Sequence, residues 1–115
     1  MFEFEKLTVY TKAKSFNKEV NTFLTTRTLD STTHHQLRRA SFSIMLNIAE
    51  GSGRSTNKDK RHFFVMSRGS AFECVAIFDY LKDIGVMTEV DFKKYYQLLD
   101  ELSRMLYGMI KSLSK

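Results

Sequence analysis

Residues 40–55 read ASFSIMLNIAEGSGRS. No charged side chain stands in residues 40–49, and a glutamate, two glycines and an arginine then follow within five residues. A helix at the edge of a bundle shows a polar face to water, whereas a helix that is apolar nearly all round is buried on more than one side. The stretch therefore predicts a helix with two buried faces that ends at a tight joint.

The second buried face has two explanations. One helix face is expected to carry Leu37, Ile44 and Ile48, which follow the three-and-four spacing of a helix, while three apolar side chains lie off this stripe: Phe42, Met45 and Leu46. Either another copy of the protein covers these three side chains, or the helix lies at the centre of one tightly packed monomer. We expect the first, and place an oligomer interface there.

The rest of the chain also favours helices. Its 115 residues suit one domain, residues 1–115, and they include no proline and only five glycines, so few breaks are enforced. Four helices are expected: Thr8–Thr26, one from a Thr33/Gln36 capping box, one from Thr56 with Asp59 to a left-handed Gly85, and one from Thr88 with Asp91. Short connections make neighbours antiparallel, so we predict an all-α, antiparallel up-down four-helix bundle.

The joint after residue 46 holds a charge that needs a partner. A carboxylate in the last turn of a helix, such as Glu50, opposes the helix dipole, so Arg54 or Arg68 is expected to pair with it. Gly51 and Gly53 are expected to let the chain turn sharply, and small residues around Gly69 to let another helix approach. The predicted structural polar hub, with Arg54 as its cation, comprises Asn47, Glu50, Gly51, Gly69, Ser70 and Glu73.

Positive charge is concentrated in the middle of the chain. The net charge is +5, and residues 38–61 hold six basic residues against two acids. A basic patch of this kind suits the phosphates of a nucleic acid, and a merely solvated surface is the alternative. The candidate phosphate contacts are Arg38, Arg39, Arg54, Lys58, Lys60, Arg61 and Arg68.

Catalysis, metals and cofactors are not expected. Arg27 and His34 have a spacing found in small helical ribonucleases, which keeps that activity as an alternative, but no carboxylate pair or Ser-His-Asp set accompanies them. The side chains of His34, His35, His62 and Cys74 lack the spacing of zinc ligands.

A cytoplasmic protein without membrane contact is expected. The N-terminal residues MFEFEKL carry acids where a signal peptide carries basic residues, and no apolar run reaches the length of a membrane span. The single cysteine, Cys74, rules out a disulfide within one chain and suits a reducing interior.

A longer motif runs through the middle of the chain. Residues 43–73, SIMLNIAEGSGRSTNKDKRHFFVMSRGSAFE, resemble the bacterial four-helix bundle family first noticed as proteins encoded within intervening sequences of 23S ribosomal RNA. The match lies in residues 43–44, 47–55, 63–64 and 68–70 and at Glu73, with weaker agreement toward both ends of the chain. Accessory variability determinants of diversity-generating retroelements are similar to the same family. Members often carry a proline in the first interhelical loop, where this chain reads TLDSTTHH.

This resemblance implies a four-helix protomer that assembles into a ring-like homopentamer with a basic surface. It also implies nucleic-acid binding without known catalysis and, in the retroelement members, a reverse-transcriptase partner. Two main hypotheses follow. The protein is a non-catalytic, nucleic-acid-binding homo-oligomer, or it is an interaction scaffold for a reverse transcriptase or another protein.

Overall fold

The computed structural model of the protein describes residues 1–114, and every regular element within them is helical. A short 3-10 helix, η1 (Glu3–Lys6), precedes four long helices: α1 (Thr8–Thr26), α2 (Ser31–Ser52), α3 (Asn57–Asp83) and α4 (Glu89–Ser112). The prediction of an all-α fold with four helices is confirmed, and the first predicted helix has the observed bounds. The short helix η1 was not predicted.

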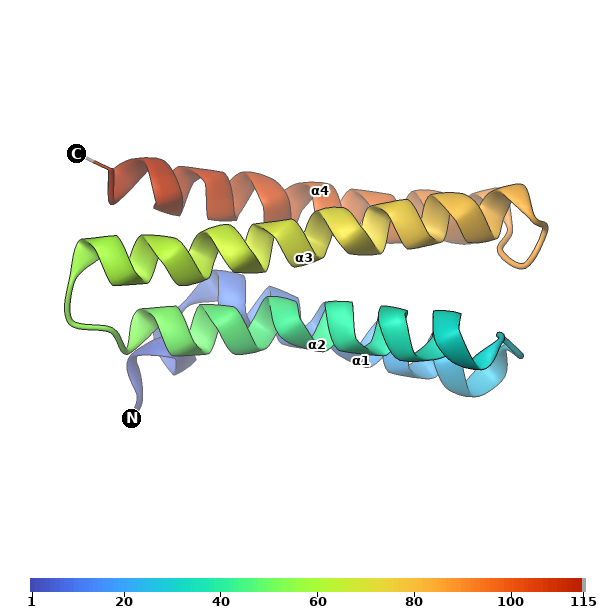
Figure 1. Ribbon diagram of the computed structural model, residues 1–115, viewed down its shortest axis with the longest axis horizontal. Coiled ribbons are helices and arrows are strands. Elements are labelled where there is room, and N and C mark those ends of the chain that lie inside the picture. The colour runs from blue at the N-terminus through green and yellow to red at the C-terminus, as the bar shows by residue number, and fades with distance from the viewer. Residues whose placement is uncertain (115) are drawn as a thin grey trace.

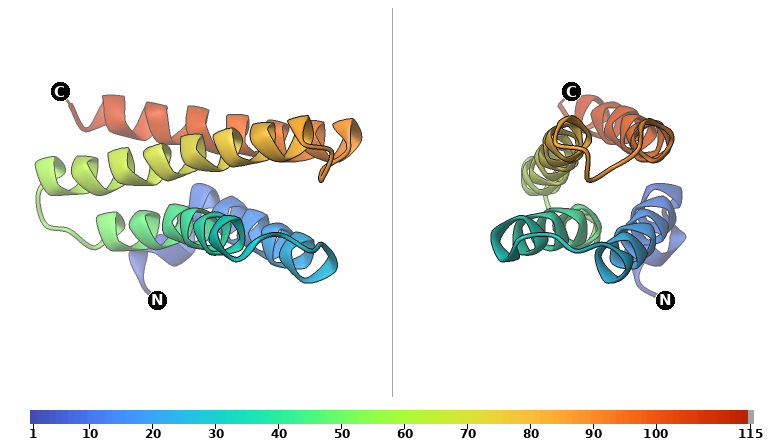
Figure 2. Two further views of the ribbon diagram at one scale, coloured as in Figure 1. Left: turned by 45° about the vertical axis from the view of Figure 1, so that its right-hand side comes forward. Right: turned by 90° about the vertical axis from the view of Figure 1, so that its right-hand side faces the viewer.

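The four helices form two layers. Figure 1 shows successive helices running back and forth along the long axis, which measures 44 Å against 25 and 22 Å for the other two. The end-on view in Figure 2 places α1 beside α2 in one layer and α3 beside α4 in the other. The start of η1, the α2–α3 connection and the end of α4 all lie at one end, which we call the joint end (Figure 1).

Two helix starts are capped as the sequence predicts. The Thr56 hydroxyl accepts a hydrogen bond from the Asp59 amide at 3.1 Å, and the Thr88 hydroxyl accepts one from the Asp91 amide at 3.1 Å. At the other end of α3, Gly85 takes a left-handed conformation with φ of 79°, which costs glycine little. These three positions fix both ends of α3 and the start of α4.

The predicted N-cap of α2 is wrong by three residues. The helix begins at Ser31, and its N-cap is Asp30, whose carboxylate accepts from the Thr33 amide at 3.5 Å. Thr33 therefore lies in the first turn rather than at the cap. Asp is as good an N-cap as Thr or Ser, so two competing cap signals stand three residues apart here.

An aromatic cluster fills the core between α1, α3 and α4. The rings of Phe78 and Tyr95 stack at a centroid distance of 4.7 Å, and Phe16 and Phe23 approach both rings edge-on at 5.9–6.5 Å. Edge-to-face and offset pairs are the arrangements that aromatic rings prefer. Burial of this cluster ties the two layers together.

Small residues bring α2 and α3 close together. The Ser67 hydroxyl donates to the Ile44 carbonyl at 2.7 Å, and Ser70 donates to the Ser43 hydroxyl at 2.9 Å. A Cβ on Gly51 would lie 2.9 Å from carbons of Phe63 and Phe64. Gly51 is therefore required for close packing inside α2, which corrects the expectation that it lets the chain turn.

Gly69 was predicted to let another helix approach, but it lies against no other helix of the described chain. It is exposed, and a Cβ there would meet no atom within 4 Å among residues 1–114. Its neighbours Ser67, Ser70 and Ala71 are buried, so the small-residue contact lies two positions before Gly69 and one and two positions after it.

No helix of the described chain is both long and apolar enough to cross a membrane.

Candidate nucleic-acid interface

The predicted polar hub is three separate sets of contacts. Asn47 donates through Nδ2 to the Ser43 hydroxyl at 2.9 Å, and Ser70 donates to the same hydroxyl, so these three side chains form the buried part. Glu50 pairs with Arg54, and Glu73 pairs with Arg39. The first set holds α2 to α3, whereas the other two are ion pairs at the surface.

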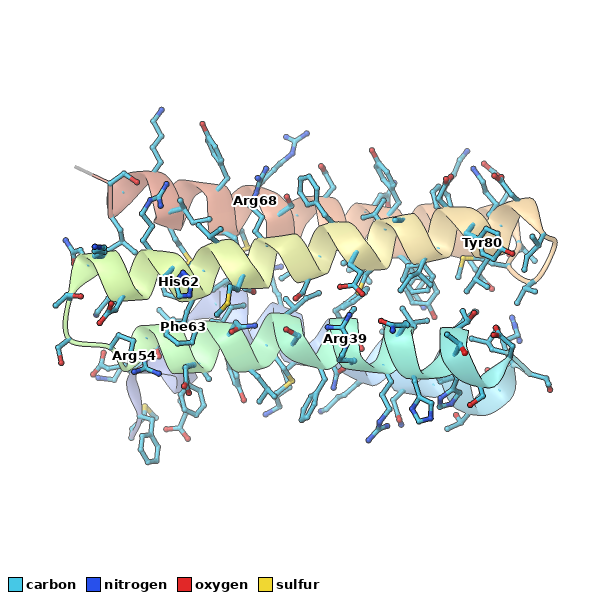
Figure 3. The ribbon with its side chains drawn as sticks, viewed as in Figure 1. Arg39, Arg54, His62, Phe63, Arg68 and Tyr80 are labelled. Carbon is cyan, nitrogen blue, oxygen red and sulfur yellow. The ribbon has the colours of Figure 1, made fainter. Side chains whose placement is uncertain are left out.

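Arg54 is held at the joint end by two contacts. Its Nη2 donates to Glu50 Oε1 at 2.8 Å, as predicted, and its guanidinium carbon lies 4.5 Å from the centroid of the Phe63 ring. Figure 3 shows Arg54 and Phe63 together at the joint end, with His62 next along α3. Because the carboxylate offsets its charge, Arg54 is a weaker candidate for phosphate binding than an unpaired cation.

Arg39 is offset in a similar way. Its guanidinium donates to Glu73 on α3 and, at 3.1 Å, to Gln36 one turn earlier on α2. Both members of the Arg39–Glu73 pair are partly exposed, so the pair adds little to stability. Arg38, the next residue back, is exposed and forms no ion pair within residues 1–114.

Three cations at the start of α3 carry no counter-charge. Lys58, Lys60 and Arg61 lie in its first two turns, and none forms an ion pair within the described chain. Arg61 Nε instead donates to the Ser114 hydroxyl at 2.7 Å, which fixes the start of α3 against the end of α4. Asp59 is the one acid in the first turn. The positive end of the α3 dipole adds to the attraction for anions here.

The end of α4 brings further cations to this place. Arg104 and Lys111 lie seven residues apart on α4 with Tyr107 between them, a spacing that puts all three on one side of the helix. Arg104 pairs with Asp100 at 3.0 Å, whereas Lys111 is exposed. The sequence analysis missed these residues because it considered only the concentration of positive charge in residues 38–61. Grouping the charges by helix face would have found them.

Arg68 faces α4 rather than the joint. Its Nε donates to the Ser103 carbonyl at 3.2 Å, and its guanidinium lies against the rings of Phe72 and Tyr107. In Figure 3 it projects from α3 on the opposite side from Arg54 and Arg39. Arg68 therefore does not share a surface with Arg54, although both were predicted as phosphate contacts.

The predicted interface residues lie at the surface of α2. Phe42 is 43% exposed and Leu46 is 47% exposed, while Met45 is half-buried. The core stripe Leu37, Ile44 and Ile48 is fully buried. The structure thus leaves two large apolar side chains of α2 in contact with water.

The remaining candidates are Arg27, the histidines and Cys74. Arg27 pairs with Asp91 at 3.3 Å, and no three His, Cys, Asp or Glu side chains in residues 1–114 gather where they could hold a metal ion. Burial raises the pKa of the Cys74 thiol to about 12, with the nearby Glu73 carboxylate as a further cause. The thiol therefore stays protonated at neutral pH and is a poor nucleophile.

The fold matches a known structure closely. A crystal structure of a protein with unknown function from the S23 ribosomal protein family of Bacteroides thetaiotaomicron superposes with a TM-score of 0.84 at 21% identity, covering 90% of this chain and 99% of that one. A search of curated proteins finds no match. Residues 5–108 match the family described as 23S rRNA-intervening sequence protein. The chain therefore belongs to the 23S rRNA-intervening sequence protein family.

Proposed function

We propose that the protein is a non-catalytic, nucleic-acid-binding homo-oligomer of the bacterial cytoplasm. Its protomer is an antiparallel up-down bundle, and several protomers assemble into a ring, five in number by resemblance to the family. The observation that carries this proposal is a set of cations at the joint end that form no ion pair within residues 1–114: Lys58, Lys60, Arg61 and Lys111.

The chemistry of these cations suits phosphate rather than a specific base. Three of the four are lysines, which act as point charges on flexible stems and carry little geometric preference. Contacts of this kind position a nucleic acid without reading its sequence. A symmetric oligomer repeats the patch in every copy, so weak single sites add by avidity.

The test is binding of labelled RNA and DNA across a salt series. Replacing Lys58, Lys60 and Arg61 together by glutamine should remove most of the binding. It should also reduce the magnitude of the slope of log K against log salt by about 2–3, because each of the three lost phosphate contacts removes about 0.7–0.9 of a released counterion. The same reactions are run on a gel, where intact substrate is expected because no catalytic set is proposed.

A matched triple variant tests whether position or total charge matters. Lys14, Lys18 and Lys93 are exposed and form no ion pair in the described part of the chain, so their change to glutamine removes the same charge elsewhere. We expect this variant to bind almost as the wild type does. Equal loss in both variants would contradict a local site. Absence of wild-type binding at low salt would favour the second hypothesis, a protein partner such as a reverse transcriptase.

A further inference from the structure

Two exposed aromatic rings flank an arginine on the outer side of α3 and α4. The guanidinium carbon of Arg68 lies 4.8 Å from the ring centroid of Phe72 and 5.3 Å from that of Tyr107. Phe72 is 56% exposed and Tyr107 is 53% exposed. The hydrogen bond from Arg68 to the Ser103 carbonyl holds the guanidinium in place. We call these three flat side chains, Phe72, Arg68 and Tyr107, the α3–α4 platform.

The platform opens onto a groove. Its volume is about 600 Å³, and its lining includes Phe72, Arg68, Phe92 and Tyr96. Packing within one bundle does not explain such large rings at the surface, because they bury only part of their area there. The groove is therefore suited to a flat apolar group that enters from outside.

Charge is unevenly distributed along the groove. On the side of the joint end, Arg61 lies seven residues before Arg68 on α3, and Lys111 lies four residues after Tyr107 on α4, so both continue the faces that carry the platform. On the other side, the lining includes Asp79 and the Asp100–Arg104 ion pair. Negative charge on a ligand is therefore favoured at the joint-end side of the platform.

We propose that the α3–α4 platform stacks unpaired bases of a single-stranded nucleic acid, whose phosphates lie along Arg61 and Lys111. Aromatic rings with neighbouring arginines and a basic groove are the usual means of holding single strands. The bases of a duplex are already stacked inside the helix and cannot reach such a platform. This proposal rests on the proposed function and adds a preference for single strands over duplexes.

The dimensions agree with a short strand. Arg61 and Phe72 are eleven residues apart on one helix, which corresponds to roughly 16 Å along its axis at about 1.5 Å per residue. This distance accommodates a few nucleotides in one protomer. Hydrophobic contact with a second copy is the competing use of the surface, and the experiment includes it as an outcome.

The experiment compares a single strand, the matching duplex and a single strand with abasic sites. The variant Phe72→Leu/Tyr107→Leu keeps apolar bulk and removes both ring faces. We expect its Kd for the single strand to rise about tenfold or more, as for the loss of one or two stacked bases, and its Kd for the duplex to change by less than about twofold. The wild type and the double variant should bind the abasic strand with similar, weak affinity, because its abasic sites offer no base to stack on the platform.

Two further variants keep the test informative. Tyr80 is 59% exposed on the same helix but lies near its far end (Figure 3), so Tyr80→Leu is the matched control and should bind like the wild type. Arg68→Lys keeps the charge and removes the planar guanidinium, so it should lose affinity for the single strand only.

The outcomes separate this proposal from the proposed function. If the wild type binds neither nucleic acid, both fail. If the double variant binds single strand and duplex as the wild type does, or loses both equally, the platform is overturned while phosphate binding stands. A change in the mass of the double variant by light scattering would assign the surface to contact between copies, and would also overturn the platform.

Discussion

Gly51 lies inside α2 at the place where α3 comes closest. Its missing side chain leaves room for Phe63 Cβ and the Phe64 ring, each of which would lie 2.9 Å from an added Cβ. Phe63 Cβ is attached directly to the backbone of α3, and the Phe64 side chain is buried, so neither can move away without shifting the helix. The distance between α2 and α3 therefore depends on glycine at this position.

We expect Gly51→Ala to lower the free energy of unfolding by about 1–2 kcal/mol. Alanine gains about 1 kcal/mol in helix propensity over glycine, but the strain of overpacking commonly costs more than this gain. Gly69→Ala is the matched control, because the same change in α3 meets open space and should stabilise the protein by up to about 1 kcal/mol. Urea unfolding of both variants measures the difference, and a stabilised Gly51→Ala would contradict the close-packing role.

Single residues also show what the sequence could predict about the site. The Glu50–Arg54 ion pair follows from spacing and helix polarity alone, because both partners lie on one short segment. Arg68 could not be placed in this way. Its contacts with Ser103 and Tyr107 lie on α4, more than thirty residues away, and depend on how α3 and α4 pack together.

At the scale of elements, two of the three predicted caps are the observed ones and one is not. Thr56 and Thr88 each stand three residues before an aspartate, and both are the observed caps. Before α2, Asp30 and Thr33 compete, and the sequence cannot show which of them lets the first turn form. The apolar stripes of the helices were also predictable, because each depends on local periodicity.

The Asp30 cap leads to a prediction on the stability of α2. Asp30→Ala should lower the free energy of unfolding by about 1 kcal/mol, because the Thr33 amide loses its acceptor at the helix start. Thr33→Ala should cost much less, since its side chain lies within the first turn and caps nothing. Thermal or urea unfolding measures both. A larger loss for Thr33→Ala would restore the capping box that the sequence suggested.

At the scale of the whole molecule, charge is divided between holding the bundle and facing outward. Ion pairs Lys12–Glu101, Lys94–Glu19 and Arg27–Asp91 join α1 to α4, at distances of 2.9–3.3 Å. These pairs use two of the acids of α4, Asp91 and Glu101, and Asp100 pairs with Arg104, so Lys111 is left without an acidic partner among residues 1–114. The proposed basic surface thus depends on how acids and bases are sorted between helix faces, which a total of +5 does not reveal.

The apolar surface of α2 is the other outward feature of the whole molecule. Phe42 and Leu46 are four residues apart, so their side chains lie on one face of α2, and Met45 packs beside them against the core. In the proposed oligomer this face is covered by a neighbouring protomer. We expect the wild type to have a mass in solution that is a multiple of its 13.4 kDa chain.

A carboxylate on this face should prevent assembly without unfolding the protomer. Phe42→Asp and Leu46→Asp each place a carboxylate on this face. In the oligomer this charge would be buried without a partner, at a cost of several kcal/mol, whereas in the separate chain it stays in water. Val90→Asp is the control: Val90 is 78% exposed in the first turn of α4, where an acid is favoured by the helix dipole. Light scattering should give a smaller mass for the two α2 variants and the wild-type mass for the control.

If Leu46→Asp keeps the wild-type mass, the interface lies elsewhere. If the wild type is itself a monomer, the exposed face of α2 needs another explanation, and a different protein as its partner becomes the next hypothesis to test.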